Sequence, residues 1–170
     1  GPVHKNVKFI MEIYHEWAVS QPKNKALVAY VSMHGSTYVL VNRLVSRLEE
    51  AGVSVEKLNL DQLDEGRVAM ALVDAATIVI GTPTVLAGPH PKAVYAAYLA
   101  NLLRPKARFV SVIGSFGWGG RTLEAISGLI PNLKVEVLKP VMVKGLPAEN
   151  DLAQIDELAA LIAERHTGIE

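Results

Sequence analysis

Short apolar runs alternate with amphipathic helical segments along most of the chain, and this alternation restricts the fold more than any other feature. Five runs predict β-strands, at residues 26–32, 53–60, 76–83, 107–115 and 134–145. The runs at 26–32 and 76–83 lack a regular polar–apolar alternation, which is typical of strands buried on both faces. Pro140 interrupts the last run, because proline has no N–H for a strand ladder.

Helical periodicity fills the intervals between these strands. Helices are expected at residues 36–51, 64–73, 90–103, 121–130 and 151–166. Gly52 stands where a helix C-terminal glycine belongs, and Pro91 lies in a first turn, where its missing N–H costs nothing. Strands that alternate with helices predict an α/β fold, namely a five-stranded parallel sheet with helices on both faces and right-handed crossovers.

A separate amphipathic helix is predicted ahead of the first strand. Its apolar residues at helical spacing are Phe9, Ile10, Ile13, Tyr14 and Trp17, within residues 8–19. The polar stretch SQPKNK follows as a linker. We therefore expect a leading helix and linker over residues 1–24 and the α/β domain over residues 25–170. The Gly-Pro start is compatible with a cloning remnant or with a cut inside a longer protein.

Composition excludes several classes of function. The chain has 17 Lys and Arg against 17 Asp and Glu, so no net charge favours nucleic acid or an anionic membrane. It contains no cysteine, which excludes thiolate nucleophiles, iron–sulfur clusters and Cys-based zinc sites. No apolar run approaches the roughly 20 residues that a membrane-spanning helix needs. We expect a cytoplasmic domain without nucleic-acid or membrane partners.

The first strand runs into the loop SMHGST, residues 32–37, which leads directly into a helix. Ser32, Ser36 and Thr37 supply hydroxyls, and Gly35 permits a left-handed or closely approached backbone. With the free N–H groups of the helix N-terminus, these residues predict a cradle for a phosphate. The alternative is an ordinary N-cap by Ser36 or Thr37. The loop matches neither the P-loop nor the dinucleotide-binding glycine motif.

The third strand is followed by the long loop GTPTVLAGPHP, residues 81–91. Thr82 and Thr84 are candidates to bind the polar edge of a ligand, and residues 85–87 offer an apolar wall. A simple turn would be shorter and more polar. His90 has two interpretations, a catalytic side chain or a helix-initiating residue between two prolines.

The fourth strand ends in GSFGWGG, residues 114–120, which holds an aromatic pair among four glycines. Glycine is costly to order, and tryptophan is rarely left in water without a reason. Trp118 either folds back to cap the core or forms an aromatic wall beside a planar ligand, with glycine N–H groups near the ligand's polar edge.

These three loops are expected to meet, because ligands of parallel α/β sheets bind beyond the carboxyl ends of the strands. Together they describe a ligand with a planar ring joined through a polar linker to one phosphate. Flavin mononucleotide, FMN, fits that description. The five histidines are scattered, and their spacing to carboxylates resembles no metal site. We therefore predict neither catalytic side chains nor metal ligands in this chain.

The loops also resemble those of a known family. SMHGST, GTPTVLAGPHP and SFGWGG are similar to the FMN loops of the flavodoxin-like domain in A-type flavoproteins, or flavodiiron proteins, and the similarity covers nearly the whole chain. The resemblance implies a flavodoxin-like three-layer αβα sandwich with strand order 2-1-3-4-5. The FMN-binding residues that it implies are Ser32, Met33, His34, Gly35, Ser36, Thr37, Pro83, Thr84, Val85, Leu86, Ala87, Gly88, Ser115, Phe116, Gly117, Trp118, Gly119 and Gly120.

The function implied by the resemblance is FMN binding and electron relay. Full-length members reduce oxygen or nitric oxide at a diiron centre in a metallo-β-lactamase-like domain, whose H-x-E-x-D-H ligand pattern this sequence lacks. The chain is therefore not expected to reduce a substrate alone. The implied partners are that diiron domain and an electron-donor reductase or rubredoxin-type protein. The final acceptor and the formation of a homodimer stay open.

Three other functions fit the sequence less well. A free-standing flavodoxin-type carrier would begin near Lys25, and the leading helix argues against it. An NAD(P)H:quinone reductase of the same fold would need a nicotinamide site, for which the chain has no motif. A response-regulator-like switch would need a phosphoacceptor Asp after a central strand, whereas these strands end in Ser32 and Gly81-Thr82.

Overall fold

The computed structural model describes residues 5–19, 21–62 and 65–169. The helices are α1 (Val7–Ala18), α2 (Ser36–Glu50), η1 (Leu60–Gln62, one 3₁₀ turn), α3 (Glu65–Asp74), α4 (Pro91–Leu103), α5 (Thr122–Leu129) and α6 (Glu149–Arg165). The strands are β1 (Lys23–Tyr30), β2 (Ser54–Asn59), β3 (Ala75–Val85), β4 (Gly88–Pro89), β5 (Phe109–Phe116), β6 (Glu136–Val137) and β7 (Val141–Lys144). Parts of the predicted leading segment (residues 1–4 and 20) and Asp64 of one predicted helix lie outside the described residues.

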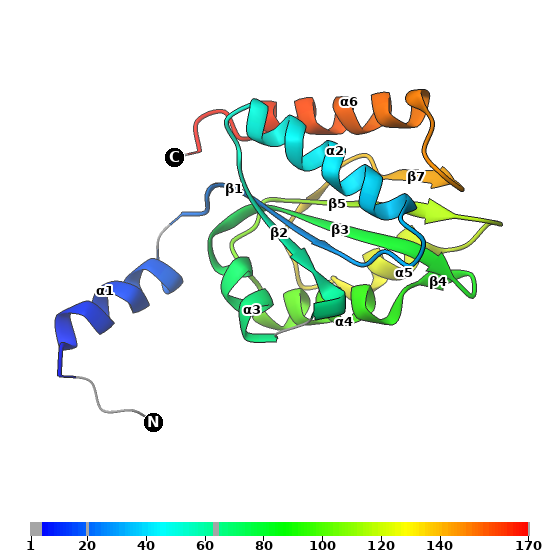
Figure 1. Ribbon diagram of the computed structural model, residues 1–170. Helices are drawn as coiled ribbons and strands as arrows, with labels where there is room; N and C mark the ends of the chain where they lie inside the picture. The colour runs from blue at the N-terminus through cyan, green and yellow to red at the C-terminus, as the bar shows by residue number, and fades with distance from the viewer. Residues whose placement is uncertain (1–4, 20, 63–64, 170) are drawn as a thin grey trace.

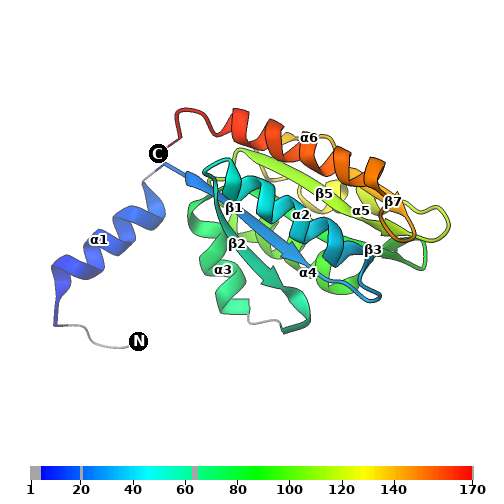
Figure 2. The same ribbon diagram turned by 45° about the horizontal axis from the view of Figure 1, so that its top comes forward.

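The long strands form the predicted parallel sheet, in the order β2-β1-β3-β5. The two short strands β6 and β7 both pair with β5, along its edge opposite β3. Helices α2 and α6 cover one face of this sheet, and α3, α4 and α5 cover the other (Figure 1). The turned view separates the same three layers and shows α1 standing apart from them (Figure 2). The flavodoxin-like sandwich, its strand order and its leading helix are therefore confirmed.

The expected count of five strands is wrong in two places. The expected fifth strand is split into β6 and β7, because Pro140 has no N–H with which to continue the ladder. The Ser111 hydroxyl donates to the Lys139 carbonyl at 3.2 Å and so supplies a hydrogen bond within the gap. The second difference is β4, which pairs antiparallel with the end of β3 and is a part of the loop predicted there.

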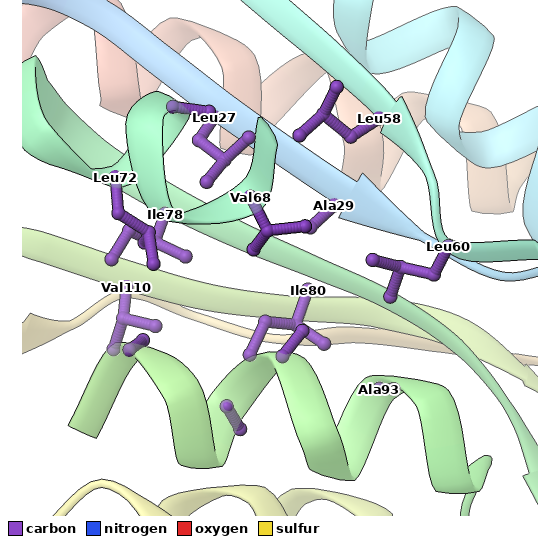
Figure 3. Packing of buried hydrophobic residues seen from close by; sticks show 14 of the residues in the cluster. Leu27, Ala29, Leu58, Leu60, Val68, Leu72, Ile78, Ile80, Ala93 and Val110 are labelled. Atoms are coloured by element: carbon purple, nitrogen blue, oxygen red, sulfur yellow. The ribbon is translucent and has the colours of Figure 1, made fainter. Parts of the chain in front are cut away.

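Both faces of β1 and β3 are buried, which explains why their sequences show no alternation. Leu27 of β1 packs with Ile78 and Ile80 of β3 against the side of α3 and α4, where Leu72 lies between helix and sheet (Figure 3). The neighbouring residue Val28 faces the opposite side and packs among the buried leucines of α2 and the isoleucines of α6.

An ion-pair cluster joins the two helices on that opposite face. The Arg43 guanidinium of α2 donates two hydrogen bonds of 2.7 Å to the Asp156 carboxylate of α6, and Arg47 adds a third at 3.1 Å. The hydrogen bonds from Arg43 are the main reason why the pKa of Asp156 is lowered to about 2. The cluster links α2 to α6 and stays charged at all physiological pH values.

A buried histidine ties the C-terminal turn to the amino end of the sheet. His166 is 3% exposed, with Nδ1 2.9 Å from Asn24 Oδ1 and Nε2 2.6 Å from the Thr77 hydroxyl. Since Asn24 Oδ1 can only accept, Nδ1 carries the proton, and Nε2 accepts from Thr77. Asn24 in turn donates to the Gly52 carbonyl at 3.1 Å. Burial disfavours the charged imidazolium and so lowers the pKa of His166 below its ordinary value of 6.5.

The lowered pKa of His166 makes stability pH-dependent. Between the folded and the unfolded pKa the unfolded chain binds more protons, so the free energy of unfolding falls as the pH drops below about 6.5, by at most about 1.4 kcal/mol per pH unit. We expect His166→Gln to remove this part of the dependence. Urea denaturation of both proteins at pH 7.5, 6.5 and 5.5 measures it, and equal losses of stability on acidification would contradict the assignment.

Candidate functional site

The carboxyl ends of β1, β3 and β5 open onto one cleft of about 470 Å³, at the edge of the sheet where β4 lies in Figure 1. This volume lies within the range of ordinary ligand sites. The residues that line it are Ser32, Met33, His34, Ser36, Thr37, Pro83, Thr84, Val85, Leu86, Ala87, Ser115, Phe116, Gly117, Trp118, Gly145 and Leu146. All three predicted loops therefore contribute to the same cleft.

The first loop brings the N-terminus of α2 to the cleft. Gly35 is the N-cap residue, with a left-handed backbone at φ +87°, and it has no side chain of its own to cap the helix. The interpretation of Ser36 or Thr37 as an ordinary N-cap is therefore wrong. Ser32 Oγ accepts a hydrogen bond from the Tyr38 N–H at 3.2 Å and closes the loop. The other N–H groups of the first turn have no partner within the helix, and its dipole favours a negative charge.

Two buried hydroxyls lie together in the lining of the cleft. Thr37 of α2 is 1% exposed, Ser115 of β5 is also buried, and their oxygens are 3.4 Å apart. These residues are 78 positions apart in sequence, and only the packing of α2 against β5 brings them together. A hydroxyl can both donate and accept, so the pair suits the polar, uncharged part of a ligand.

The second loop is a tight hairpin. Thr84 pairs with Pro89 and Val85 with Gly88, so β3 extends two residues past the predicted end at position 83. The two residues of the turn, Leu86 and Ala87, have φ +48° and +66° without being glycine. This left-handed conformation costs roughly 1–2 kcal/mol for each non-glycine residue.

The polar side chains of this loop differ from the sequence prediction. The Thr82 hydroxyl is buried, donates to the Pro83 carbonyl at 2.9 Å and accepts from the His90 N–H at 3.0 Å, so its prediction as a ligand group is wrong. Thr84 lines the cleft, but its hydroxyl lies 2.8 Å from that of Thr122. His90 is the N-cap of α4, and its Nδ1 accepts from the Lys92 N–H at 3.2 Å. The helix-initiating interpretation of His90 is confirmed.

The third loop packs directly on the hairpin. A Cβ at Gly120 would lie 2.6 Å from Thr84 Cγ2 and 3.0 Å from the Ala87 carbonyl oxygen, so only glycine fits there. The Arg121 N–H also donates to the Ala87 carbonyl at 2.8 Å. The absence of a side chain at Gly120 thus allows the second and third loops to pack closely together.

Trp118 projects from the third loop into water at the cleft. Its side chain is 84% exposed and lines the cleft, so the alternative that it caps the core is wrong. Phe116 is less exposed and lies between this cleft and a smaller cavity of about 230 Å³ on the other side of the loop.

Four of the predicted residues do not line the cleft, and two residues that line it were not predicted. Gly35, Gly88, Gly119 and Gly120 lie outside the lining, where the first two shape turns and the last two border the smaller cavity. Gly145 and Leu146 follow β7 and complete the lining. The turn sequence Gly-Leu-Pro directly after the last strand was a signal for them, because that strand ends at the same edge of the sheet.

The described part of the chain contains no cluster of three or more His, Cys, Asp or Glu side chains placed to hold a metal ion. It likewise contains no helix with the length and apolar character needed to cross a membrane. Among the described residues, the lining of the cleft holds no Asp, Glu, Lys or Arg side chain and one histidine, His34.

Comparison with known proteins gives a consistent result. The flavodoxin family model matches residues 28–157. The nitric oxide reductase of Moorella thermoacetica is 31% identical over 92% of this chain and 40% of its own length. The structure of rubredoxin oxygen:oxidoreductase from Desulfovibrio gigas superposes with a TM-score of 0.87 at 25% identity, covering 94% of this chain and 40% of that one.

A third neighbour is much shorter. The structure of an archaeal flavodoxin superposes with a TM-score of 0.72 at 23% identity and covers 84% of this chain and 99% of its own, which shows the fold alone. The chain spans about 40% of the length of the first curated relatives it matches.

Strain in the hairpin turn gives a stability prediction. We expect Ala87→Gly to raise the free energy of unfolding by about 1 kcal/mol, because glycine adopts the left-handed conformation without steric cost. The same exchange at Ala153, an exposed position within α6, should instead lower it by about 0.5–1 kcal/mol. Urea denaturation measures both, and a loss of stability at position 87 would show that the turn is unstrained.

Proposed function

We propose that this chain, which belongs to the flavodoxin family, binds FMN in the cleft and carries electrons through it. One observation carries the proposal: three loops from distant parts of the sequence, each with a feature suited to a different part of FMN, line a single cleft of about 470 Å³. The residues proposed to hold FMN are those predicted from the sequence, with the glycines outside the lining acting through the backbone.

The phosphate of FMN would lie at the N-terminus of α2. The first-turn N–H groups and the Ser36 hydroxyl provide donors, and the positive end of the helix dipole offsets the phosphate charge without a lysine or arginine. Gly35, with its left-handed backbone, begins the helix directly before Ser36 and Thr37 of the lining. The Thr37 and Ser115 hydroxyls, 3.4 Å apart, would bind the polar linker between phosphate and ring.

The ring would lie against Trp118, with Val85 and Leu86 of the hairpin on the apolar side of the cleft. FMN supplies the redox chemistry, and the residues of the chain orient it and set its potential. An apolar wall excludes water and disfavours added negative charge on the ring, which lowers its reduction potential.

We further propose that the electrons pass to a diiron domain that reduces oxygen or nitric oxide. The support is that the matched relatives, which include a nitric oxide reductase and a rubredoxin-oxygen oxidoreductase, are about two and a half times as long as the part this chain matches. Residues 1–24 would then join that domain to the flavin domain, and a rubredoxin-type protein or a reductase would supply electrons.

A free-standing electron carrier is the second candidate. The observation that favours it is the archaeal flavodoxin, nearly all of which superposes on this chain. The two candidates share FMN binding and differ in the acceptor, so the reading frame upstream of residue 1 separates them: an iron-ligand domain there supports the relay, and a start codon there supports the carrier.

Titration with FMN tests the shared function. We expect one FMN per chain, a yellow complex and no preference for FAD. Trp118→Ala should weaken FMN binding about fivefold, because an aromatic face against a planar ring contributes on the order of 1 kcal/mol, and should raise the reduction potential of the flavin. Trp17→Ala is the matched control, since Trp17 of α1 lies outside the cleft.

Two outcomes would contradict this assignment. Failure of the wild-type chain to form a tight complex in excess FMN would exclude the flavin function altogether. Equal FMN affinity and equal flavin potential in wild type and Trp118→Ala would leave the FMN-binding proposal intact but show that Trp118 does not lie against the ring.

A further inference from the structure

The most exposed large apolar side chains of the described residues gather at one place. Leu86, Trp118 and Leu146 are 99%, 84% and 72% exposed, the three highest values among large hydrophobic side chains in the part of the chain that the structure describes. All three line the cleft. Single exposed leucines are ordinary, but apolar side chains concentrated around one concavity indicate a ligand that covers them.

Leu146 is the member of this group that comes from outside the three predicted loops. It belongs to the segment between β7 and α6. Helix α6 packs on the same face of the sheet as α2. In the cleft it shares the lining with Ser36 and Thr37 at the N-terminus of α2 and with Ser115 at the end of β5. Leu146 therefore adds a fourth segment of the chain to the lining of the cleft.

The backbone holds Leu146 in this position from both directions. On one side, Gly145 has φ +73°, and its N–H donates to the Phe116 carbonyl at 2.9 Å, just beyond the pairing of β7 with β5. On the other side, Pro147 restricts the conformation of Leu146 and leads into the N-cap of α6. The Ala148 N–H donates to the Asp151 carboxylate at 2.9 Å and anchors that end.

We propose that Leu146 is a ligand-contact residue that covers bound FMN from this fourth segment of the lining and slows its release. The inference rests on the proposed FMN function. A ligand in the cleft would remove the Leu146 side chain from water. This burial would stabilise only the complex, because Leu146 is 72% exposed in the free chain and contributes little to the core. Truncating it should therefore affect the release of FMN and leave the stability of the free chain unchanged.

The test compares FMN release from three variants with that from wild type. Loaded protein is diluted, and the recovery of free FMN fluorescence gives the dissociation rate. We expect Leu146→Ala to release FMN about tenfold faster, and Leu146→Met, which keeps the apolar bulk, to remain within about twofold of wild type. Leu102→Ala removes the same group from a 57% exposed position on α4 outside the cleft, and should leave the rate unchanged.

The outcomes separate this inference from the function on which it rests. If wild type releases FMN slowly and Leu146→Ala releases it at the same rate, the role of Leu146 is overturned and the FMN-binding proposal stays intact. Equal acceleration in Leu102→Ala or a lowered urea midpoint of free Leu146→Ala also overturns it, since the effect would then be general destabilisation. A wild-type chain that retains no FMN overturns both.

Discussion

Parallel hydrogen bonding between β1, β3 and β5 is the constraint on which the rest of the structure depends. Because the three strands run in the same direction, every loop that follows them emerges at one edge, and segments more than 80 residues apart in sequence share one cleft. Burial of the strands on both faces keeps that edge rigid. The cleft thus has a stable floor, while the side chains around its mouth stay exposed to water.

Close backbone approaches turn this shared edge into a shaped site. The β3–β4 hairpin contacts the third loop at Gly120, where a Cβ would be too close to Thr84 and Ala87. A Cβ at Gly114 would likewise overlap the Thr82 carbonyl oxygen, so both positions need glycine. The hairpin in turn accepts left-handed backbone at Leu86 and Ala87. Strain of this kind persists only where the surroundings hold it, and it is common at ligand sites.

The two ends of the sheet have different physical characters. At the amino end, His166, Thr77 and Asn24 form a closed hydrogen-bond network with every polar atom paired, which ties the C-terminal turn to the core. At the carboxyl end, the N-terminus of α2 and the most exposed of the large apolar side chains line the cleft. The amino end therefore holds a closed polar network, whereas ligand binding is proposed at the carboxyl end.

The sequence by itself determined the class of fold, because buried strands and amphipathic helices have periods that local residue order reveals. It also indicated which three loops would line a ligand site, but whether Trp118 caps the core or faces the cleft was decided only by the structure. Only the tertiary structure decided that Thr82 turns inward, that Thr37 lies beside Ser115, and that Leu146 lines the cleft from a fourth segment. These facts depend on the direction of a side chain and on the packing of α2 and α6 against one face of the sheet, which brings together residues that are far apart in sequence.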